Sequence, residues 1–150
     1  MQNISYGIVS LFLILMAVAT SLGAVFPLSP VMAGMYLVVV LLGTLLILVS
    51  YCSKCPCRDS DCSHVLPGKL ASLLPKRKEG PYSFADVLFT AMGIAAILLM
   101  PQLWLIHNIP SLVLFWGFIA VAVFMIVFLV CPDCSNRFCF LCGKRNKTPA

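Results

Sequence analysis

The sequence predicts an all-α integral membrane protein, built as a four-helix bundle of two antiparallel helical hairpins with a Cys-rich cytoplasmic cap. Of its 150 residues, 61% are hydrophobic and only 10% are charged, so there is too little polar surface to cover a soluble globule. Four apolar runs approach the ~20 residues that a helix needs to cross a bilayer. Helices also satisfy every backbone group within one segment, which lipid requires.

The first predicted hairpin joins the spans 6–26 and 31–51. We expect the first span to be retained rather than cleaved as a signal peptide, because no Lys or Arg precedes it. It ends at Pro27, and Pro30 begins the next span, with Ser29 as a suitable N-cap. The link is short and uncharged, which predicts that the two helices are antiparallel neighbours.

The second predicted hairpin joins the spans 84–105 and 109–130. Ser83 and Asp86 have the spacing of a capping box, which also places a carboxylate at the positive end of the helix dipole. Pro101 lies near the end of the third span and is expected to break its last turn.

Aromatic and imidazole side chains mark the turn between these two spans. Trp104 and Trp116 are expected at the far membrane interface, where aromatic belts are common. His107 lies in the short turn itself, so we expect it to be a capping or headgroup-level residue rather than a metal ligand.

The positive charges predict the orientation of the spans. All ten Lys and Arg residues lie in the loop 52–83 or in the tail 131–150, which share one face of a four-helix protein. The positive-inside rule makes that face cytoplasmic, together with both termini. We expect residues 1–150 to form a single membrane domain in which the loop and the tail are the elaborated parts.

The loop contains a pattern of its own. Leu66, Leu70, Leu73 and Leu74 recur at helical spacing, and the basic run 76–78 follows. This favours a short interfacial helix whose basic run lies near anionic head groups. The alternative is a solvated linker whose leucines pack on the bundle.

The tail carries the more regular of two cysteine clusters, Cys131-x2-Cys134-x4-Cys139-x2-Cys142-Gly143. Each C-x2-C pair can hold a metal ion through a tight turn, and four thiolates form a complete structural zinc site. The segment 139–143, Cys-Phe-Leu-Cys-Gly, resembles a rubredoxin or zinc-ribbon knuckle, and the resemblance covers those residues alone. The spacer of four residues is shorter than the hairpin found between such knuckles.

The loop carries the second cluster, Cys52-x2-Cys55-x-Cys57-x4-Cys62, followed by His64. It could use three of its cysteines, recruit His64 or share ligands with the tail. Sharing is geometrically reasonable, because the second and fourth spans end on the same face and packed helices lie roughly 8 to 10 Å apart. Cys52 and Cys131 could then belong to one site or to two neighbouring sites.

Four kinds of occupant compete for these eight cysteines. Zinc is the first expectation, because thiolates outnumber every other type of ligand. An iron-sulfur cluster is the alternative cofactor, since Cys134-x4-Cys139-x2-Cys142 has the plant-type ferredoxin spacing. Disulfides are disfavoured by a cytosolic location, and acylation would account for the juxtamembrane Cys52 and Cys131.

We therefore expect a non-enzymatic small membrane protein that is a structural or accessory subunit of a larger assembly. A protein partner would dock at the Cys-rich face, and the lipid bilayer is the other partner. The alternative is a redox subunit that carries iron-sulfur clusters or exchanges thiols and disulfides with a quinone-linked partner. Metal-ion transfer between the clusters lacks a ligand path across the membrane. No nucleotide-binding loop, paired carboxylates or nucleic-acid partner are indicated, and no catalytic residues.

Overall fold

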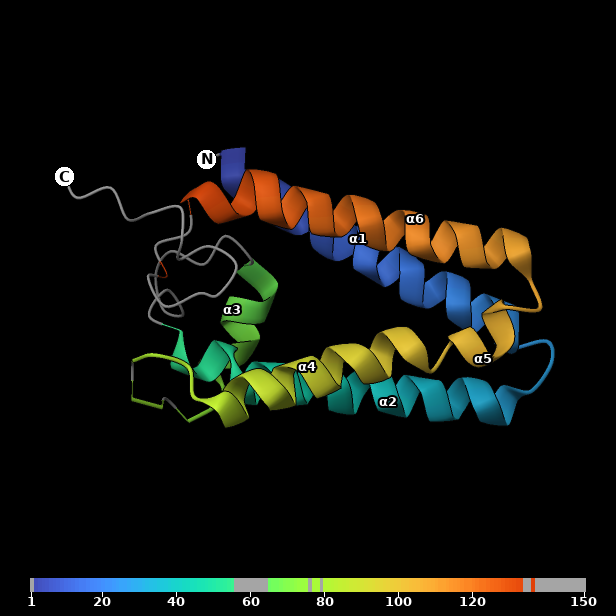
Figure 1. Cartoon of the computed structure of the whole chain (residues 1–150), viewed down its shortest axis with the longest axis horizontal. Helices are drawn as coiled ribbons and strands as arrows, with labels where there is room; N and C mark the ends of the chain where they lie inside the picture. Colours follow the sequence, from blue (N-terminus) through green and yellow to red (C-terminus); the bar gives the residue numbers. More distant parts are fainter. Residues whose placement is uncertain (1, 56–64, 76, 79, 134–135, 137–150) are drawn as a thin grey trace.

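The computed structural model describes residues 2–55, 65–75, 77–78, 80–133 and 136, and every regular element among them is helical (Figure 1). The α-helices are α1 (Gln2–Val25), α2 (Pro30–Ser50), α3 (Val65–Ser72), α4 (Phe84–Leu99), α5 (Gln102–Leu105) and α6 (Ile109–Met125). Shorter 3-10 or π turns are η1 (Cys52–Lys54), η3 (Ile126–Val130) and η4 (Cys131–Asp133). The predicted all-helical fold class is confirmed.

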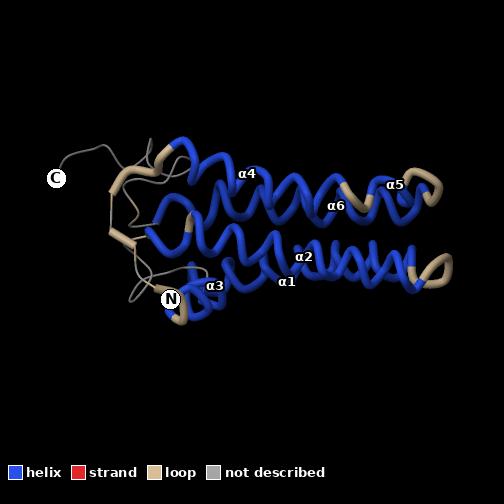
Figure 2. The backbone as a smooth tube through the Cα atoms, turned by 90° about the horizontal axis from the view of Figure 1, so that it is seen from below, coloured by secondary structure: helices blue, strands red, loops and turns tan. Residues whose placement is uncertain are grey.

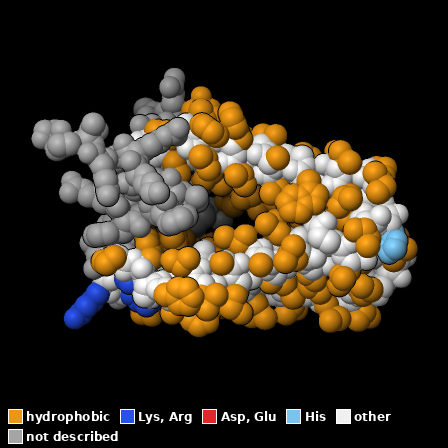
Figure 3. Space-filling model, in the orientation of Figure 1, with side chains coloured by type: hydrophobic (Ala, Val, Ile, Leu, Met, Phe, Trp, Pro, Cys, Tyr) orange, Lys and Arg blue, Asp and Glu red, His pale blue; other side chains and the backbone are white. Residues whose placement is uncertain are grey.

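In this described part of the chain, four helical stretches are long enough and apolar enough to cross a membrane. They are Ser5–Val25, Pro30–Lys54, Phe84–Leu105 and Ile109–Val130. Their outer surface is covered by large hydrophobic side chains, as Figure 3 shows for one face of the molecule. The prediction of four long apolar helices is confirmed.

Side-chain caps and prolines determine where two of these helices begin. The Ser29 hydroxyl accepts a hydrogen bond from the Met32 amide at 3.3 Å, and Pro30 occupies the first turn of α2. At α6 the Asn108 side chain accepts from the Ser111 amide at 3.3 Å. Both caps satisfy amides that have no partner within the helix.

The four long helices run side by side along the long axis of the molecule (Figures 1 and 2), but the packed pairs are not the sequential hairpins. The closest packing joins α1 with α6 and α2 with α4, whereas α1 and α2 contact each other much less despite their short link. The prediction that consecutive helices are the packed neighbours therefore needs correction. Short links set the antiparallel direction, and the shapes of the helix faces decide the pairing.

Two glycines allow α2 and α4 to pack at backbone distance. A Cβ atom added to Gly93 would lie 2.8 Å from the carbonyl oxygen of Gly43, and one added to Gly43 would lie 3.0 Å from the carbonyl oxygen of Gly93. Small residues that let backbones approach are a principal means of packing helices in lipid.

The pair α1 and α6 packs through small side chains on α1. Ser10, Ala17 and Ser21 are fully buried on α1, and Phe115 and Ala122 are buried on α6. The Ser10 hydroxyl is satisfied within its own helix by the Gly7 carbonyl at 2.9 Å.

The two pairs are joined at the end that carries the short turns. A core cluster there contains Ala17, Val18, Val25, Ala33, Tyr36, Trp104, Leu105 and Phe115. Trp104 donates from Nε1 to the carbonyl oxygen of Ser21 at 3.2 Å and meets the Tyr36 ring edge to face, with the ring centroids 5.4 Å apart. The Tyr36 hydroxyl donates to the Ile97 carbonyl oxygen at 3.2 Å. This cluster includes residues of α1, α2, α5 and α6.

The prediction that Trp104 lies in an interfacial belt is wrong. Trp104 is 5% exposed, because the break after α4 at Pro101 starts the separate helix α5 and turns the indole into the core. Trp116, in contrast, is 42% exposed, and its Nε1 donates to Gln102 Oε1 at 3.3 Å.

Away from the core cluster the two pairs diverge (Figure 1). Helix α3 lies across the open end, contacts both α1 and α2, and buries Ala71 completely. A short helix in the loop was predicted, and α3 is that helix. Leu70 on α3 is 41% exposed and Leu73, just beyond its end, is 82% exposed, so neither is buried against the bundle.

Candidate functional site

The described charged side chains gather at the end where α2 ends, α4 begins and α6 ends. Figure 3 shows the Lys and Arg side chains of this face at this end and a His side chain at the opposite end. His107 is exposed, as its predicted place in the far turn requires. The turn that carries Cys52 and Cys55 lies at this end, which we describe as the candidate site.

Asp86 is the centre of the site because it caps α4. Its backbone N–H donates to Ser83 Oγ at 3.2 Å, and its Oδ2 accepts from the Ser83 N–H at 3.0 Å. The predicted capping box is therefore present.

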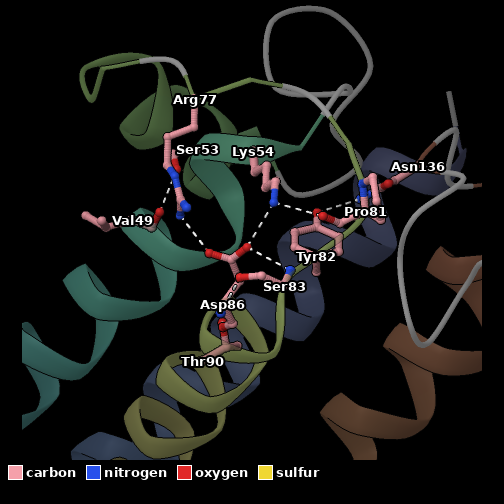
Figure 4. Close-up of polar contacts among 10 residues, drawn as sticks. All are labelled: Val49, Ser53, Lys54, Arg77, Pro81, Tyr82, Ser83, Asp86, Thr90 and Asn136. Carbon is pink, nitrogen blue, oxygen red and sulfur yellow. Dashed lines mark hydrogen bonds and ion pairs between the residues drawn. The ribbon is translucent and has the colours of Figure 1, made fainter.

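The same carboxylate binds two cations from the loop, which the sequence did not reveal (Figure 4). Lys54 Nζ lies 3.0 Å from Oδ2, and Arg77 Nη1 lies 2.8 Å from Oδ1. The carboxylate side chain is only 4% exposed, that of Lys54 15% and that of Arg77 46%. We call Asp86, Lys54 and Arg77 the Asp86 cluster. A carboxylate this deeply buried needs such partners, since an isolated buried charge is costly.

The Asp86 cluster fixes the path of the loop against the helices. Lys54 also donates to the Pro81 carbonyl oxygen at 2.8 Å, and the Arg77 backbone N–H donates to the Ser53 carbonyl oxygen at 3.3 Å. The C-terminal part of the loop is thus tied to the end of α2.

Two predicted ligands lie on the turn that this arrangement holds. Cys52 begins η1, and the Cys55 N–H donates to the Cys52 carbonyl oxygen at 3.2 Å. Both cysteines are half-buried. The turn brings a C-x2-C pair close together in the chain, as a metal knuckle requires.

Asn136 connects the tail to this turn. Its Nδ2 lies 3.3 Å from Cys55 Sγ and 3.0 Å from the Tyr82 hydroxyl oxygen. The Tyr82 ring stacks on Tyr51 at the end of α2, with the centroids 4.2 Å apart and an interplanar angle of 2°. Tyr51 in turn packs against the buried Cys131. The turn at the end of α2, the entry to α4 and Asn136 therefore meet, and whether the two cysteine clusters are neighbours stays a prediction.

Three of the eight predicted ligands, Cys52, Cys55 and Cys131, belong to the described part of the chain. The other candidates lie outside the described residues: Cys57, Cys62, Cys134, Cys139, Cys142 and His64. Among the described residues, no three His, Cys, Asp or Glu side chains form a group that could hold a metal ion. Cys52 and Cys55 carry soft sulfur donors, and the metal site stays a prediction.

Cys131 is disulfide-bonded and nearly fully buried at the start of η4. Sulfur in a disulfide is not a thiolate, so this residue could bind a metal ion only after reduction. A cytosolic location disfavours purely structural disulfides.

Comparison with known proteins gives no match: no family model, no curated protein and no solved structure is similar to this chain. The function must therefore be argued from the chemistry of the site.

Proposed function

We propose that the chain is a multi-pass integral membrane protein whose four long apolar helices span the bilayer. The support is the hydrophobic outer surface of these helices, on which side chains such as Phe12, Leu41, Val113 and Phe124 are more than half exposed. In water this surface would aggregate, whereas in lipid it is satisfied.

The orientation follows from charge. All ten Lys and Arg residues belong to the loop and the tail, so the positive-inside rule places this end, both termini and both cysteine clusters in the cytoplasm. The disulfide at Cys131 is compatible with that placement if it is a reactive bond, since cytosolic disulfides are usually transient and catalytic or redox-sensing.

At that end the protein acts as a structural or accessory subunit of a larger membrane assembly, with the Cys-rich cap as the surface on which a protein partner docks. The observation that carries this proposal is the joining of three chain segments at one end by the Asp86 cluster and Asn136. The opposite end offers only short uncharged turns.

Zinc is the cofactor we propose for the cap. Cys52 and Cys55 would hold it through the η1 turn, and the remaining ligands would come from Cys57, Cys62, Cys131, Cys134, Cys139 and Cys142. A zinc site closed by four protein ligands would link the loop and tail without redox chemistry, and its binding energy would add to the folding energy of these segments. Cys131 would join such a site only in its reduced form.

The disulfide at Cys131 favours a second candidate function, a redox subunit. In it, a partner dithiol would reduce the Cys131 disulfide: the partner's two thiols become a disulfide, and two thiols form on this chain. Reoxidation would pass two electrons and two protons to a quinone-linked partner. An iron-sulfur carrier belongs to the same class and would use the same cysteines.

Elemental analysis, visible absorption and thiol counting on the purified protein separate these functions. The proposed cap predicts a colourless, zinc-containing protein that does not respond to dithionite, and Cys134→Ser should lower its zinc content. A brown protein that bleaches with dithionite would establish the iron-sulfur alternative. A metal-free protein whose thiol count rises on reduction would establish thiol and disulfide exchange.

A further inference from the structure

The molecule has a hollow between its two helix pairs. The core cluster joins α1 and α6 to α2 and α5 at the turn end, and the pairs diverge from there toward the charged end (Figure 1). At the charged end α3 contacts both α1 and α2, and Tyr51 packs against Cys131. Figure 3 shows this hollow, with hydrophobic side chains along both of its borders.

The hollow suits hydrocarbon rather than water. No Asp, Glu, Lys or Arg occurs in the sequence between residues 2 and 53, or between residues 87 and 132. Three hydroxyls along the long helices bond within their own helix: Ser10 to Gly7, Thr20 to Met16, and Thr90 to the Asp86 carbonyl. These three groups are already paired, and among the described residues the buried Ser21 hydroxyl is left without a hydrogen-bond partner. A water molecule needs several polar partners, which a single hydroxyl does not supply.

The open end of the hollow is cationic. Helix α3 crosses it with Lys69 exposed, and Arg77 and Lys78 are exposed in the segment that follows. Asp86 neutralises Lys54 and Arg77, against which its carboxylate is buried, and so does not offset Lys69 or Lys78. Among the described side chains whose exposure is known, every exposed Lys, Arg, Asp or Glu is therefore a cation.

We propose that an anionic phospholipid of the loop-side leaflet occupies the hollow. Its acyl chains lie between the two helix pairs, and its phosphate binds Lys69 and Lys78 at the open end. Basic residues near a membrane surface attract anionic head groups in this way. The inference rests on the proposed membrane insertion, and it is independent of zinc and of the redox chemistry of the cysteines.

The test begins with the protein purified from membranes in mild detergent and washed extensively. Phosphatidylglycerol and phosphatidylcholine with identical acyl chains are then added, and retained lipid is measured by native mass spectrometry and thermal unfolding by circular dichroism. We expect phosphatidylglycerol to be retained at a fixed ratio to the chain and to raise the Tm more than phosphatidylcholine does. Equal retention of the two lipids would overturn the proposal.

Matched variants locate the site. The double variant Lys69→Gln with Lys78→Gln should lose most of the preference for phosphatidylglycerol, and Lys69→Arg with Lys78→Arg should keep it. Lys144→Gln with Lys147→Gln removes the same charge from the tail and should leave retention unchanged. If the tail variant loses as much retention as the loop variant, the binding is general attraction and the site is wrong.

The readouts also separate this inference from the proposed function. Recovery of the protein in the membrane fraction after carbonate washing tests insertion, and zinc content is measured on the same samples. A membrane-embedded, zinc-containing protein without lipid preference would overturn the lipid site alone. Loss of the protein from the membrane fraction would overturn the spanning topology on which both proposals depend.

Discussion

Among single residues, Asp86 has the largest set of described polar contacts. Its carboxylate caps α4 through Ser83 and also neutralises Lys54 and Arg77, so one side chain holds a helix start and two loop segments. The capping role was predictable from the spacing of Ser83 and Asp86. The ion pairs were not, because Lys54 and Arg77 lie 32 and 9 residues away in the chain, and only the fold brings them together.

Asp86→Asn is expected to destabilise the protein much more than loss of the cap alone. The variant leaves Lys54 largely buried without its counter-ion. We expect the free energy of unfolding to fall by about 2 kcal/mol. This is below the range for fully buried ion pairs, because Arg77 is half exposed. Ser83→Ala, which removes only the cap hydroxyl, should cost about 1 kcal/mol. Thermal unfolding in detergent, followed by circular dichroism, measures both.

The same pair of variants reports on the loop. Cys52 and Cys55 lie next to Lys54, so Asp86→Asn should also speed their alkylation under conditions in which the helices remain folded. Equal melting temperatures and equal alkylation rates for Asp86→Asn and Ser83→Ala would show that the ion pairs contribute nothing to the position of this turn.

Among whole elements, the crossing of α2 and α4 is the tightest contact, and it depends on Gly43 and Gly93. Gly93→Ala places a Cβ atom 2.8 Å from the backbone oxygen of Gly43, so the two helices must move apart. We expect a loss of about 2 kcal/mol, within the range for overpacked interiors. Unfolding in a titration with a denaturing detergent checks this.

Gly34 is the matched control on α2. An added Cβ at Gly34 meets nothing within 4 Å, so Gly34→Ala tests helix propensity without a packing change. It should be neutral or stabilise the helix by up to about 1 kcal/mol. If Gly93→Ala is as harmless as Gly34→Ala, the backbone contact is not a source of stability.

The sequence predicted the elements much better than their partners. Apolar length, Pro101 and the Ser29 and Ser83 caps are local signals, and each acts in the structure where it was expected. Helix pairing is not local: Gly43 and Gly93 look like ordinary small residues until the facing helix is known. The position of Trp104 along the chain predicts an interfacial belt residue, because nothing in the sequence shows that α5 turns its side chain inward.

The candidate site was also predictable only in part. The cysteine spacings predict two clusters at one end, and the described contact between Asn136 and Cys55 places one tail residue beside the turn of the loop cluster. The residues that join the clusters, namely Asn136, Tyr51 and Tyr82, carry no sequence pattern. A stacked pair of tyrosines can be recognised only when the end of α2 and the entry to α4 are side by side.

At the scale of the whole molecule, charge and cysteine chemistry bear on the same question of sidedness. The chain has a formal net charge of +5, and all of its Lys, Arg, Asp and Glu residues belong to the loop, the start of α4 and the tail. This asymmetry favours the cytoplasm for that end. A stable disulfide at Cys131 would favour an oxidising compartment. Thiol accessibility in cells decides between them.

A membrane-impermeant maleimide applied to intact cells should leave all eight cysteines unmodified, because the proposed topology places every one of them in the cytoplasm. After permeabilisation the same reagent should modify the accessible thiols, and prior reduction should add those of the Cys131 disulfide. A cysteine introduced at His107, in the exposed far turn, is the positive control and should react in intact cells. Labelling of the native cysteines with no labelling of His107→Cys would show that the orientation is the opposite of the proposed one. The cysteine-rich end would then face an oxidising compartment, where structural disulfides rather than zinc would join the loop to the tail.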